Sequence, residues 1–320
     1  MNDEYTLGVD GGGSKTDAVI IDADGAAVGA GLGGASNANF TPRRVVTASF
    51  RSAIRSAIRH ARIDPARITR AGCTFGTVAR EVLAELGIPA EPCWFGESAV
   101  AFERAGIDEL RGVAMTAGTG SSCAVMDGSG THISAGGWGP LLGDEGSAYS
   151  IGLAGIRRAL LADEGRGGPT SLVDAVCRYF EVPKVRQAIG KLCDLKINQP
   201  LLAGFAPEVA AAAEQGDSVA IEVVQSAGDQ LGALVTFLAA KAFGPEDEFP
   251  VVLAGGVFNI GELVIEPIRR MLADRFPNAR IVMATMRPGE AVARLTLRHP
   301  ERRRKPARQY HSDHKDPEQD

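Results

Sequence analysis

Apolar and polar positions in the first part of the chain alternate in a pattern that predicts short strands followed by helices. Apolar runs at residues 5–10, 17–22 and 26–31 are separated by turns rich in glycine and aspartate, which is typical of a three-strand meander. Between residues 42 and 62, apolar side chains recur near helical spacing with arginines opposite, so we expect an amphipathic helix. A strand at 68–74, a helix at 78–86, a strand near 92–95 and a helix at 97–104 complete an alternating unit.

The same order of elements begins again near residue 111. Strands are predicted at 112–117, 122–126 and 132–135, and helices follow from about residue 146. Later segments predict helices at 171–180, 207–215 and 219–240, a strand at 250–253, a helix at 261–272 and a strand near 280–283. We therefore expect an α/β protein with two similarly built lobes, the second of which carries the additional helices.

The composition provides enough apolar material for two packed cores. The chain has 320 residues, of which 45% are hydrophobic, and a formal net charge of -5. No apolar run approaches the roughly 20 residues needed to cross a bilayer, and the N-terminus is acidic rather than basic and then apolar. We expect a cytoplasmic protein with no membrane partner.

Cysteine and histidine usage narrows the possible chemistry. The cysteines are odd in number and scattered, which suggests neither a disulfide framework nor a paired-cysteine metal site. We expect them to be small buried hydrophobic residues: Cys73, Cys93, Cys123, Cys177 and Cys193. Most histidines lie in the last stretch of the chain, so catalysis has to rely on carboxylates, hydroxyls and backbone amides.

The C-terminal segment, residues 299–320, is dense in charged residues and proline, which predicts a disordered tail. Its basic cluster at 302–305 could touch RNA or an acidic partner, but charge runs at termini are usually solvated. The sequence has no helix-turn-helix pattern and no basic groove-reading segment, so we expect no nucleic-acid partner.

Two glycine turns occupy equivalent places in the two halves. Each follows a predicted strand and precedes another strand, whereas the Walker and dinucleotide-binding glycine loops run directly into a helix. Taken alone, such a hairpin is usually a plain tight turn. Two of them, on apposed lobes, could bring backbone N–H groups to a polyphosphate from both sides. The residues concerned are Gly11, Gly12, Gly13, Ser14, Lys15 and Thr16, and then Gly118, Thr119, Gly120 and Ser121.

Three further elements add to this picture. Asp10 stands at the end of the first predicted strand and could hold Mg²⁺ through water, because that ion keeps much of its hydration shell. A glycine-dense stretch at 136–149 carries Asp144 just before a predicted helix, where capping that helix is the alternative role. The buried strand at 250–253 runs into Ala254, Gly255 and Gly256, where an adenine ring could lie on bare backbone or a helix could pack closely.

In this order and spacing, the four glycine-rich elements resemble the sugar kinase, Hsp70 and actin superfamily. Within it the chain resembles the N-acetylglucosamine kinases and the BadF/BadG/BcrA/BcrD ATPase family, from about residue 7 to 297. The resemblance implies two actin-like (ribonuclease H-like) lobes, each a mixed five-stranded sheet flanked by helices, with an interlobe cleft. The expected N-terminal lobe spans 1–110 with a C-terminal helix at about 289–298, and the second lobe spans 111–288.

The resemblance also implies roles for particular residues. Residues 11–16 and 118–121 would be the phosphate loops for ATP, and Ala254, Gly255 and Gly256 the adenosine loop. Asn37, Thr119, Gly137 and Asp144 match sugar-site positions, although Asn37 could instead be an amide that stabilises its loop. Mg²⁺ would accompany the nucleotide, and a homodimer is the expected assembly.

Three departures from the family pattern matter. Glu97 stands where relatives carry an aspartate that acts as general base, and its extra methylene displaces the carboxylate by about 1.5 Å. It could be a working base, a weaker base or only a charge at a helix N-terminus. The loop at 72–77 is shorter than in the kinases, which leaves acceptor specificity open, and Glu290 places a charge where relatives have small residues.

The sequence therefore predicts an ATP-dependent kinase of an amino sugar. N-acetylglucosamine is the first expected acceptor, with glucosamine and N-acetylmuramic acid next. One alternative is an ATPase that drives electron transfer, as in the dehydratase activators of the same family, which need a thiolate-held iron–sulfur cluster. Another is a sugar- or nucleotide-sensing protein with weakened catalysis, which the replacement of aspartate by Glu97 would explain.

Overall fold

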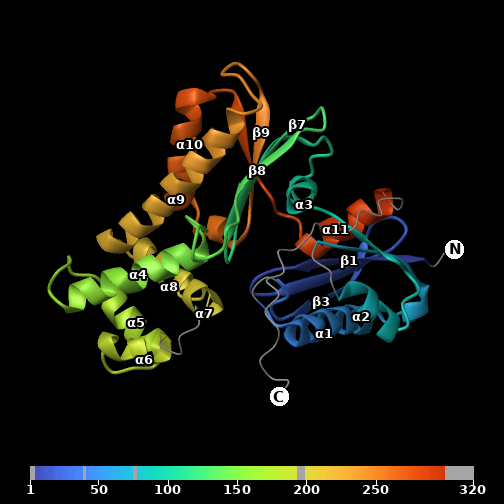
Figure 1. The fold of residues 1–320 in the computed structure, drawn as a ribbon, viewed down its shortest axis with the longest axis horizontal. Coiled ribbons are helices and arrows are strands. Elements are labelled where there is room, and N and C mark those ends of the chain that lie inside the picture. Colours follow the sequence, from blue (N-terminus) through green and yellow to red (C-terminus); the bar gives the residue numbers. More distant parts are fainter. Residues whose placement is uncertain (1–3, 39–40, 75–77, 193–198, 300–320) are drawn as a thin grey trace. The chain divides into compact units, whose positions relative to one another are not determined.

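The computed structural model describes residues 4–38, 41–74, 78–192 and 199–299 (Figure 1). The chain forms two compact units: unit 1 comprises residues 1–104 and 286–320, and unit 2 comprises residues 105–285. The predicted lobe boundaries near residues 110 and 288 stay predictions. The predicted disordered tail, apart from His299, lies outside the described residues.

Unit 1 is built on a mixed five-stranded sheet, as the sequence predicts. Its strands are β1 (Tyr5–Gly11), β2 (Thr16–Ile21), β3 (Ala27–Gly33), β4 (Ile68–Cys73) and β5 (Pro92–Trp94), in the spatial order β3-β2-β1-β4-β5. The first three form the antiparallel meander, whereas β1, β4 and β5 run parallel because helices connect them. The strand β1 is central, so its C-terminal end reaches the middle of one sheet edge.

Helices cover both faces of this sheet. They are α1 (Arg43–Ala61), α2 (Ala79–Glu85), α3 (Glu97–Arg104) and α11 (Pro288–Arg298), with a short 3-10 turn at Pro65–Arg67. The apolar stripe of α1 buries Val46, Phe50 and Ile54 in one core. A Cβ at Gly8 would fall 2.2 Å from the backbone of Ala293, so this strand glycine is what lets α11 lie against β1.

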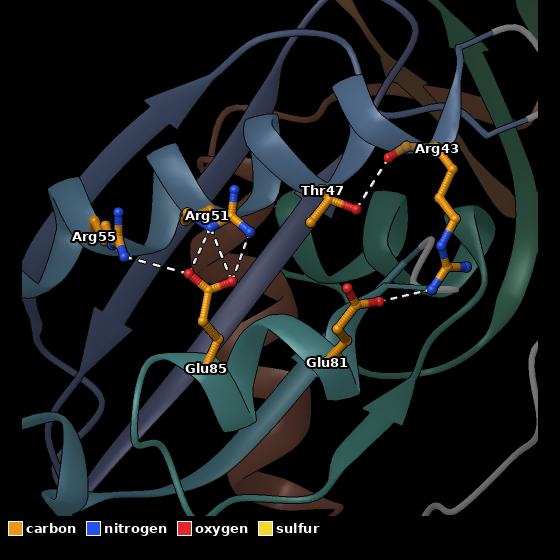
Figure 2. A network of polar contacts seen from close by, with 6 residues as sticks. All are labelled: Arg43, Thr47, Arg51, Arg55, Glu81 and Glu85. Atoms are coloured by element: carbon orange, nitrogen blue, oxygen red, sulfur yellow. Dashed lines mark hydrogen bonds and ion pairs between the residues drawn. The ribbon is translucent and has the colours of Figure 1, made fainter.

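The arginines opposite the apolar stripe of α1 meet acidic residues of α2 (Figure 2). Arg51 contacts Glu85 through both carboxylate oxygens, with Nη2 to Oε2 at 2.6 Å, and Arg43 contacts Glu81 at 2.7 Å. Arg55 adds a longer contact of 3.3 Å to Glu85. These ion pairs are at the surface, where such a pair typically contributes about 0.2–1 kcal/mol to the free energy of unfolding. They therefore link α1 to α2 but add little to the stability of the fold.

Unit 2 repeats the sheet of unit 1. Its strands are β6 (Arg111–Ala117), β7 (Ser121–Asp127), β8 (His132–Gly136), β9 (Phe249–Ala254) and β10 (Ala279–Met283), in the spatial order β10-β9-β6-β7-β8. Again the first three strands are antiparallel and the later two are parallel. The repeated order of elements in the sequence thus corresponds to a repeat of one sheet topology. The two glycine turns, β1–β2 and β6–β7, occupy the same place in it.

The additional helices of unit 2 pack around its larger core. They are α4 (Ala148–Asp163), α5 (Leu172–Phe180), α6 (Ala188–Leu192), α7 (Gln199–Ala203), α8 (Ala206–Glu214), α9 (Ser218–Ala239) and α10 (Glu262–Arg275), with 3-10 turns at Val185–Gln187 and Gly256–Ile260. The short helices α6 and α7 are absent from the sequence-based prediction. Within the described ranges, no helix is both long and apolar enough to cross a membrane.

Candidate functional site

The first glycine hairpin is fixed at its base and open at its tip. The Gly12 N–H donates to the Lys15 carbonyl at 2.9 Å, and the Gly12 carbonyl accepts from the Ser36 N–H at 2.9 Å and the Asn37 N–H at 3.1 Å. Ser14 and Lys15 are exposed. The base of the hairpin is thus held by backbone hydrogen bonds, one of them from Asn37. The role of Asn37 in sugar binding stays a prediction.

Two backbone amides at this tip are available to a ligand. The N–H groups of Gly13 and Ser14 have no hydrogen-bond partner among the described residues, whereas the Gly11 N–H donates to the Thr74 hydroxyl at 3.0 Å. Thr16 differs from the other hairpin residues, because it is fully buried and its hydroxyl lies 2.8 Å from the Gly34 carbonyl. The geometry gives Thr16 a role in holding the loop, and its direct contact with phosphate stays a prediction.

Asp10 is the residue before the last of β1, beside this hairpin, and its carboxylate is in an unusual electrostatic setting. Burial, opposed by a 2.8 Å hydrogen bond from the Thr74 hydroxyl, raises the pKa of Asp10 to about 6, and the nearby negative charge of Glu97 adds to the rise. Arg104 acts in the opposite direction. A cation bound at the Asp10 carboxylate would weaken the repulsion between Asp10 and Glu97.

The oxygen donors around Asp10 suit Mg²⁺. Mg²⁺ prefers carboxylate oxygens and usually keeps several waters, with one or two carboxylates and the substrate's phosphates as partners. Asp10 offers such a carboxylate, and Glu97 is close enough for charge coupling. Groups of three or more His, Cys, Asp or Glu that could hold a metal by themselves do not occur in the described residues. The donor set therefore fits an ion bound jointly with a phosphate ligand.

Glu97 is the first residue of α3 and its side chain is exposed. The sequence prediction placed a carboxylate at a helix start just after the last strand of the sheet, and the structure has β5 ending at Trp94 and α3 beginning at Glu97. Asp10, Glu97 and the first hairpin are thus brought together within unit 1. Which of the three roles considered for Glu97 applies stays open.

Hydrogen bonds to α3 and β2 hold the segment that brings the chain back to unit 1, residues 286–289. The Arg104 side chain donates to the Met286 carbonyl at 2.8 Å, and the Met286 N–H donates to the Arg104 carbonyl at 3.1 Å. The carboxylate of Asp17, which is buried, accepts from Arg287 and from the Gly289 N–H. Asp17 therefore caps the N-terminus of α11 and fixes it to β2. Glu290, the charge noted in the sequence, pairs with Arg294 on the helix surface at 2.9 Å.

The second glycine hairpin rests on the first turn of α4. The Gly118 N–H donates to the Gly120 carbonyl at 2.9 Å, which closes the turn. The Gly118 carbonyl accepts from the Ala148 N–H at 2.9 Å and the Thr119 carbonyl from the Tyr149 N–H at 3.2 Å. The hairpin thereby satisfies N–H groups at the start of the helix. The N–H groups of Thr119 and Gly120 have no hydrogen-bond partner among the described residues and are free for a ligand.

Asp144 is buried beneath this hairpin. Its carboxylate accepts from the Ser121 N–H at 3.1 Å and from the Gln199 side-chain amide at 3.0 Å, and burial raises its pKa. A Cβ at Gly120 would lie 2.7 Å from the carboxylate, so glycine is needed there. The alternative role as helix cap is wrong, because α4 is capped by Ser147, whose hydroxyl accepts from the Ser150 N–H.

Gly137 and the adenosine-loop candidates lie near the same hairpin. The Gly137 N–H donates to the Ser121 carbonyl at 2.8 Å, at a φ of 72°. At the end of β9, Gly255 has a φ of 114°, and a Cβ there would fall 2.2 Å from the Ala117 carbonyl. The close approach at Gly255 is therefore to strand β6, whereas the alternative considered for residues 254–256 was packing against a helix. The role of residues 254–256 as adenosine loop stays a prediction.

Two residues in these networks were missed by the sequence analysis. Thr74 hydrogen-bonds both the Gly11 N–H and the Asp10 carboxylate, and its position directly after a strand parallel to β1 is a signal that could have identified it. Gln199 bonds Asp144 from a short helix that follows the segment 193–198, and the sequence gives no pattern that points to it.

Most of the described cysteines are buried, as expected. Cys73, Cys93 and Cys123 are buried and Cys177 is half-buried, and burial raises the pKa of the Cys73 and Cys123 thiols far above its ordinary range. Cys193 lies outside the described residues. The buried thiols act as small apolar side chains.

Two α/β units with one strand order, each with a glycine hairpin between its first two strands, define the actin-like, ribonuclease H-like fold found in sugar kinases. Within this fold the chain belongs to the BadF/BadG/BcrA/BcrD ATPase family, whose model matches residues 7–289.

Curated relatives agree with this family assignment, and a solved structure agrees with the fold. The chain is 27% identical to an N-acetyl-D-glucosamine kinase of Dictyostelium discoideum over 315 residues, covering 93% of this chain and 99% of the relative. It is 24% identical to an N-acetylmuramic acid/N-acetylglucosamine kinase of Clostridium acetobutylicum, and the alignment covers 87% of this chain and 94% of the relative. A Porphyromonas gingivalis protein of known structure, proposed to be an N-acetylglucosamine kinase, has a TM-score of 0.71 at 19% identity, with 92% and 99% covered.

Proposed function

We propose that this protein is an ATP-dependent kinase that phosphorylates a hydroxyl of an amino sugar. The observation that carries the proposal is the pair of glycine hairpins at equivalent places in two sheets of one topology. Each presents two backbone N–H groups that have no hydrogen-bond partner among the residues the structure describes, Gly13 and Ser14 in one and Thr119 and Gly120 in the other. Such amides bind phosphate oxygens well, because they approach closely and carry partial positive charge.

In this proposal the two hairpins bind the phosphates of one ATP molecule. Residues 254–256 receive the adenosine, since Gly255 lies against Ala117 next to the second hairpin. Lys15 at the first tip adds a positive charge that stabilises the charge developing on the transferred phosphoryl group. Asp10 holds Mg²⁺, which neutralises phosphate charge when bound.

Glu97 is the proposed general base. A base removes the proton of the attacking hydroxyl and typically contributes about 10² to 10⁴ in rate. Glu97 is exposed at the start of α3, and its charge is coupled to that of Asp10, so it lies near the proposed metal site. Asn37, Thr119, Gly137 and Asp144 are the proposed sugar-binding residues. For Asp144 this contact would use lone pairs left by Ser121 and Gln199.

N-acetylglucosamine is the first acceptor to test, followed by glucosamine and N-acetylmuramic acid. The support comes from the names of the two curated relatives, each of which aligns with most of the chain. A homodimer is part of the proposal as the usual assembly of such enzymes.

The test is a coupled assay of ADP formation over a panel of amino sugars with wild-type and Glu97→Gln protein. We expect acceptor-dependent turnover, reduced about 10² to 10⁴-fold in Glu97→Gln because the base is lost. Glu97→Asp serves as the matched control, since it keeps the carboxylate. Turnover in Glu97→Gln equal to wild type would remove Glu97 from the mechanism. Tight sugar and ATP binding without product would identify a sensor instead.

The electron-transfer alternative has less support. It requires thiolates that share an iron–sulfur cluster between subunits. Three of the four described cysteines, Cys73, Cys93 and Cys123, are buried inside separate strands, so they cannot reach a subunit surface. An absorption spectrum of anaerobically purified protein decides this point, because a cluster would colour it brown.

A further inference from the structure

A groove on unit 1 lies apart from the residues used in the proposed function. It is formed by the exposed side of α1, the 3-10 turn that begins at Pro65 and the residue that follows α2. Its volume of about 580 Å³ falls within the roughly 300–1,000 Å³ of typical small-molecule sites. The lining combines three arginines with apolar side chains: Arg51, Arg55 and Arg59, and Ile58, Pro65 and Leu86.

The three arginines form a row along one face of α1. They recur at every fourth residue, and side chains at this spacing lie one above another, about 6 Å apart along the helix axis. The helix itself contains no aspartate or glutamate, so it supplies no charge to neutralise them. Asp64, which precedes the 3-10 turn, uses its carboxylate to accept from the Ala66 N–H at 2.9 Å. The row is thus a local excess of positive charge on a chain with a formal net charge of -5.

Contacts to α2 neutralise only part of this charge. Glu85 accepts from the Arg51 Nε at 2.8 Å and Nη2 at 2.6 Å, and from the Arg55 Nη2 at 3.3 Å (Figure 2). The Arg59 side chain is exposed and makes no hydrogen bond or ion pair with the residues that the structure describes. Three guanidinium groups therefore have one contacting carboxylate in the described part of the chain, which leaves two formal positive charges in the groove.

Phosphate matches this charge better than a carboxylate does. A phosphate monoester carries about 1.5 to 2 negative charges at pH 7 and offers three acceptor oxygens, whereas a carboxylate carries a single charge. Planar guanidinium groups bind phosphate oxygens through paired N–H donors. Arg55 and Arg59, one helical turn apart, can therefore share one phosphate group.

The apolar side of the groove indicates what the phosphate is attached to. Ile58, Pro65 and Leu86 are half-buried and line the same groove as the arginines. Covering their remaining apolar surface is favourable when the ligand brings carbon atoms, and inorganic phosphate brings none. The lining therefore suits a phosphate ester that carries a carbon skeleton.

We propose that this groove is a binding site for an organic phosphate monoester. Arg55 and Arg59 hold the phosphate group, and the apolar residues of the groove contact the carbon skeleton. None of the lining residues belongs to the glycine hairpins or to the proposed sugar site, so the inference does not depend on the proposed function.

Phenyl phosphate is the probe, because it joins a phosphate monoester to an apolar ring and is neither an amino sugar nor a nucleotide. A ligand-observed NMR titration in low-salt buffer gives its Kd. The double substitution Arg55→Gln with Arg59→Gln is expected to raise Kd at least about tenfold, because charge-assisted hydrogen bonds are lost. Arg44→Gln is the matched control and should change Kd by less than about twofold, since Arg44 is exposed on α1 but does not line the groove.

A second variant is expected to act in the opposite direction. Glu85→Gln removes the carboxylate that competes for Arg51 and Arg55, so Kd should fall about threefold, the effect of one unit charge roughly 6 Å away in water. Misfolding cannot tighten binding, so this result stays interpretable if the double variant is unstable. Glu81→Gln is its control, because Glu81 is also on α2 but pairs with Arg43, outside the groove lining.

A ligand series tests the two parts of the proposed site separately. Inorganic phosphate lacks the ring and benzoate has the smaller charge, so each should bind roughly fivefold more weakly than phenyl phosphate. Equal Kd values for the double variant and Arg44→Gln would place the probe elsewhere and overturn the inference. Benzoate bound as tightly as phenyl phosphate would overturn the choice of phosphate, and inorganic phosphate bound as tightly would overturn the apolar contact. Amino-sugar turnover enters none of these measurements, so the test stands whether or not the kinase proposal does.

Discussion

The raised pKa of Asp10 predicts that this carboxylate destabilises the fold at neutral pH. A rise from the ordinary value of 3.8 to about 6 means that the folded chain binds this proton more tightly than the unfolded chain. Between about pH 3.8 and 6 the folded state therefore holds more protons, and stability falls as the pH rises. Above pH 6 the full effect is present and amounts to at most about 3 kcal/mol, at 1.36 kcal/mol for each pKa unit.

The substitution Asp10→Asn isolates this effect. Asparagine keeps an oxygen that accepts from the Thr74 hydroxyl, but it has no charge to be buried or to be repelled by Glu97. We expect the free energy of unfolding to increase by about 1 to 3 kcal/mol at pH 7.5 and to change little at pH 4. Activity should be lost at the same time, since Asp10 is the proposed Mg²⁺ ligand, and a trade of stability for function is common at such sites.

The assay is urea unfolding from pH 4 to 8 in buffer with a chelator, so that no divalent cation compensates the charge. Asp24→Asn controls for the loss of one negative charge, because Asp24 is exposed in the β2–β3 turn. The reasoning is refuted if Asp10→Asn is less stable than wild type at pH 7.5, or if the fall in wild-type stability between pH 4 and 6 persists unchanged in the variant.

Two further predictions concern the second hairpin. Gly120→Ala places a Cβ 2.7 Å from the buried Asp144 carboxylate, so we expect a loss of about 1 to 3 kcal/mol in thermal or urea unfolding. Gly118→Ala, whose Cβ meets nothing within 4 Å, should cost less, and equal losses in the two variants would contradict the clash. Gln199→Leu removes a partner of Asp144 and should cost about 1 to 3 kcal/mol. Its effect should shrink in an Asp144→Asn background, as a double-mutant cycle would measure, and additive losses would show that the pair does not interact.

Local patterns in the sequence predicted much of the fold. The strands, the amphipathic α1 and the glycine turns can be recognised because strand alternation, helical spacing and turn chemistry act over a few neighbouring residues. The five-residue helices α6 and α7 escaped prediction, since so short a segment shows no periodicity. The repeated order of elements and the resemblance to a known superfamily predicted two similarly built lobes, and the matching strand orders of the two sheets confirm that likeness.

The contacts that shape the candidate site were decided by the tertiary structure. Thr74 and Asp10 are 64 residues apart, Gln199 and Asp144 are 55 apart, and Asp17 meets Arg287 across 270 residues. Local patterns can mark where a residue stands in its own element, but they do not show its partner, because such pairs form only when the strands and helices that carry them are assembled. The same reason explains why Asp144 was a candidate cap in the sequence and is a buried partner of Ser121 in the fold. The sequence by itself determined which residue types stand at the ends of the strands. The packing of the sheets and helices determined which of these residues interact through hydrogen bonds or charge.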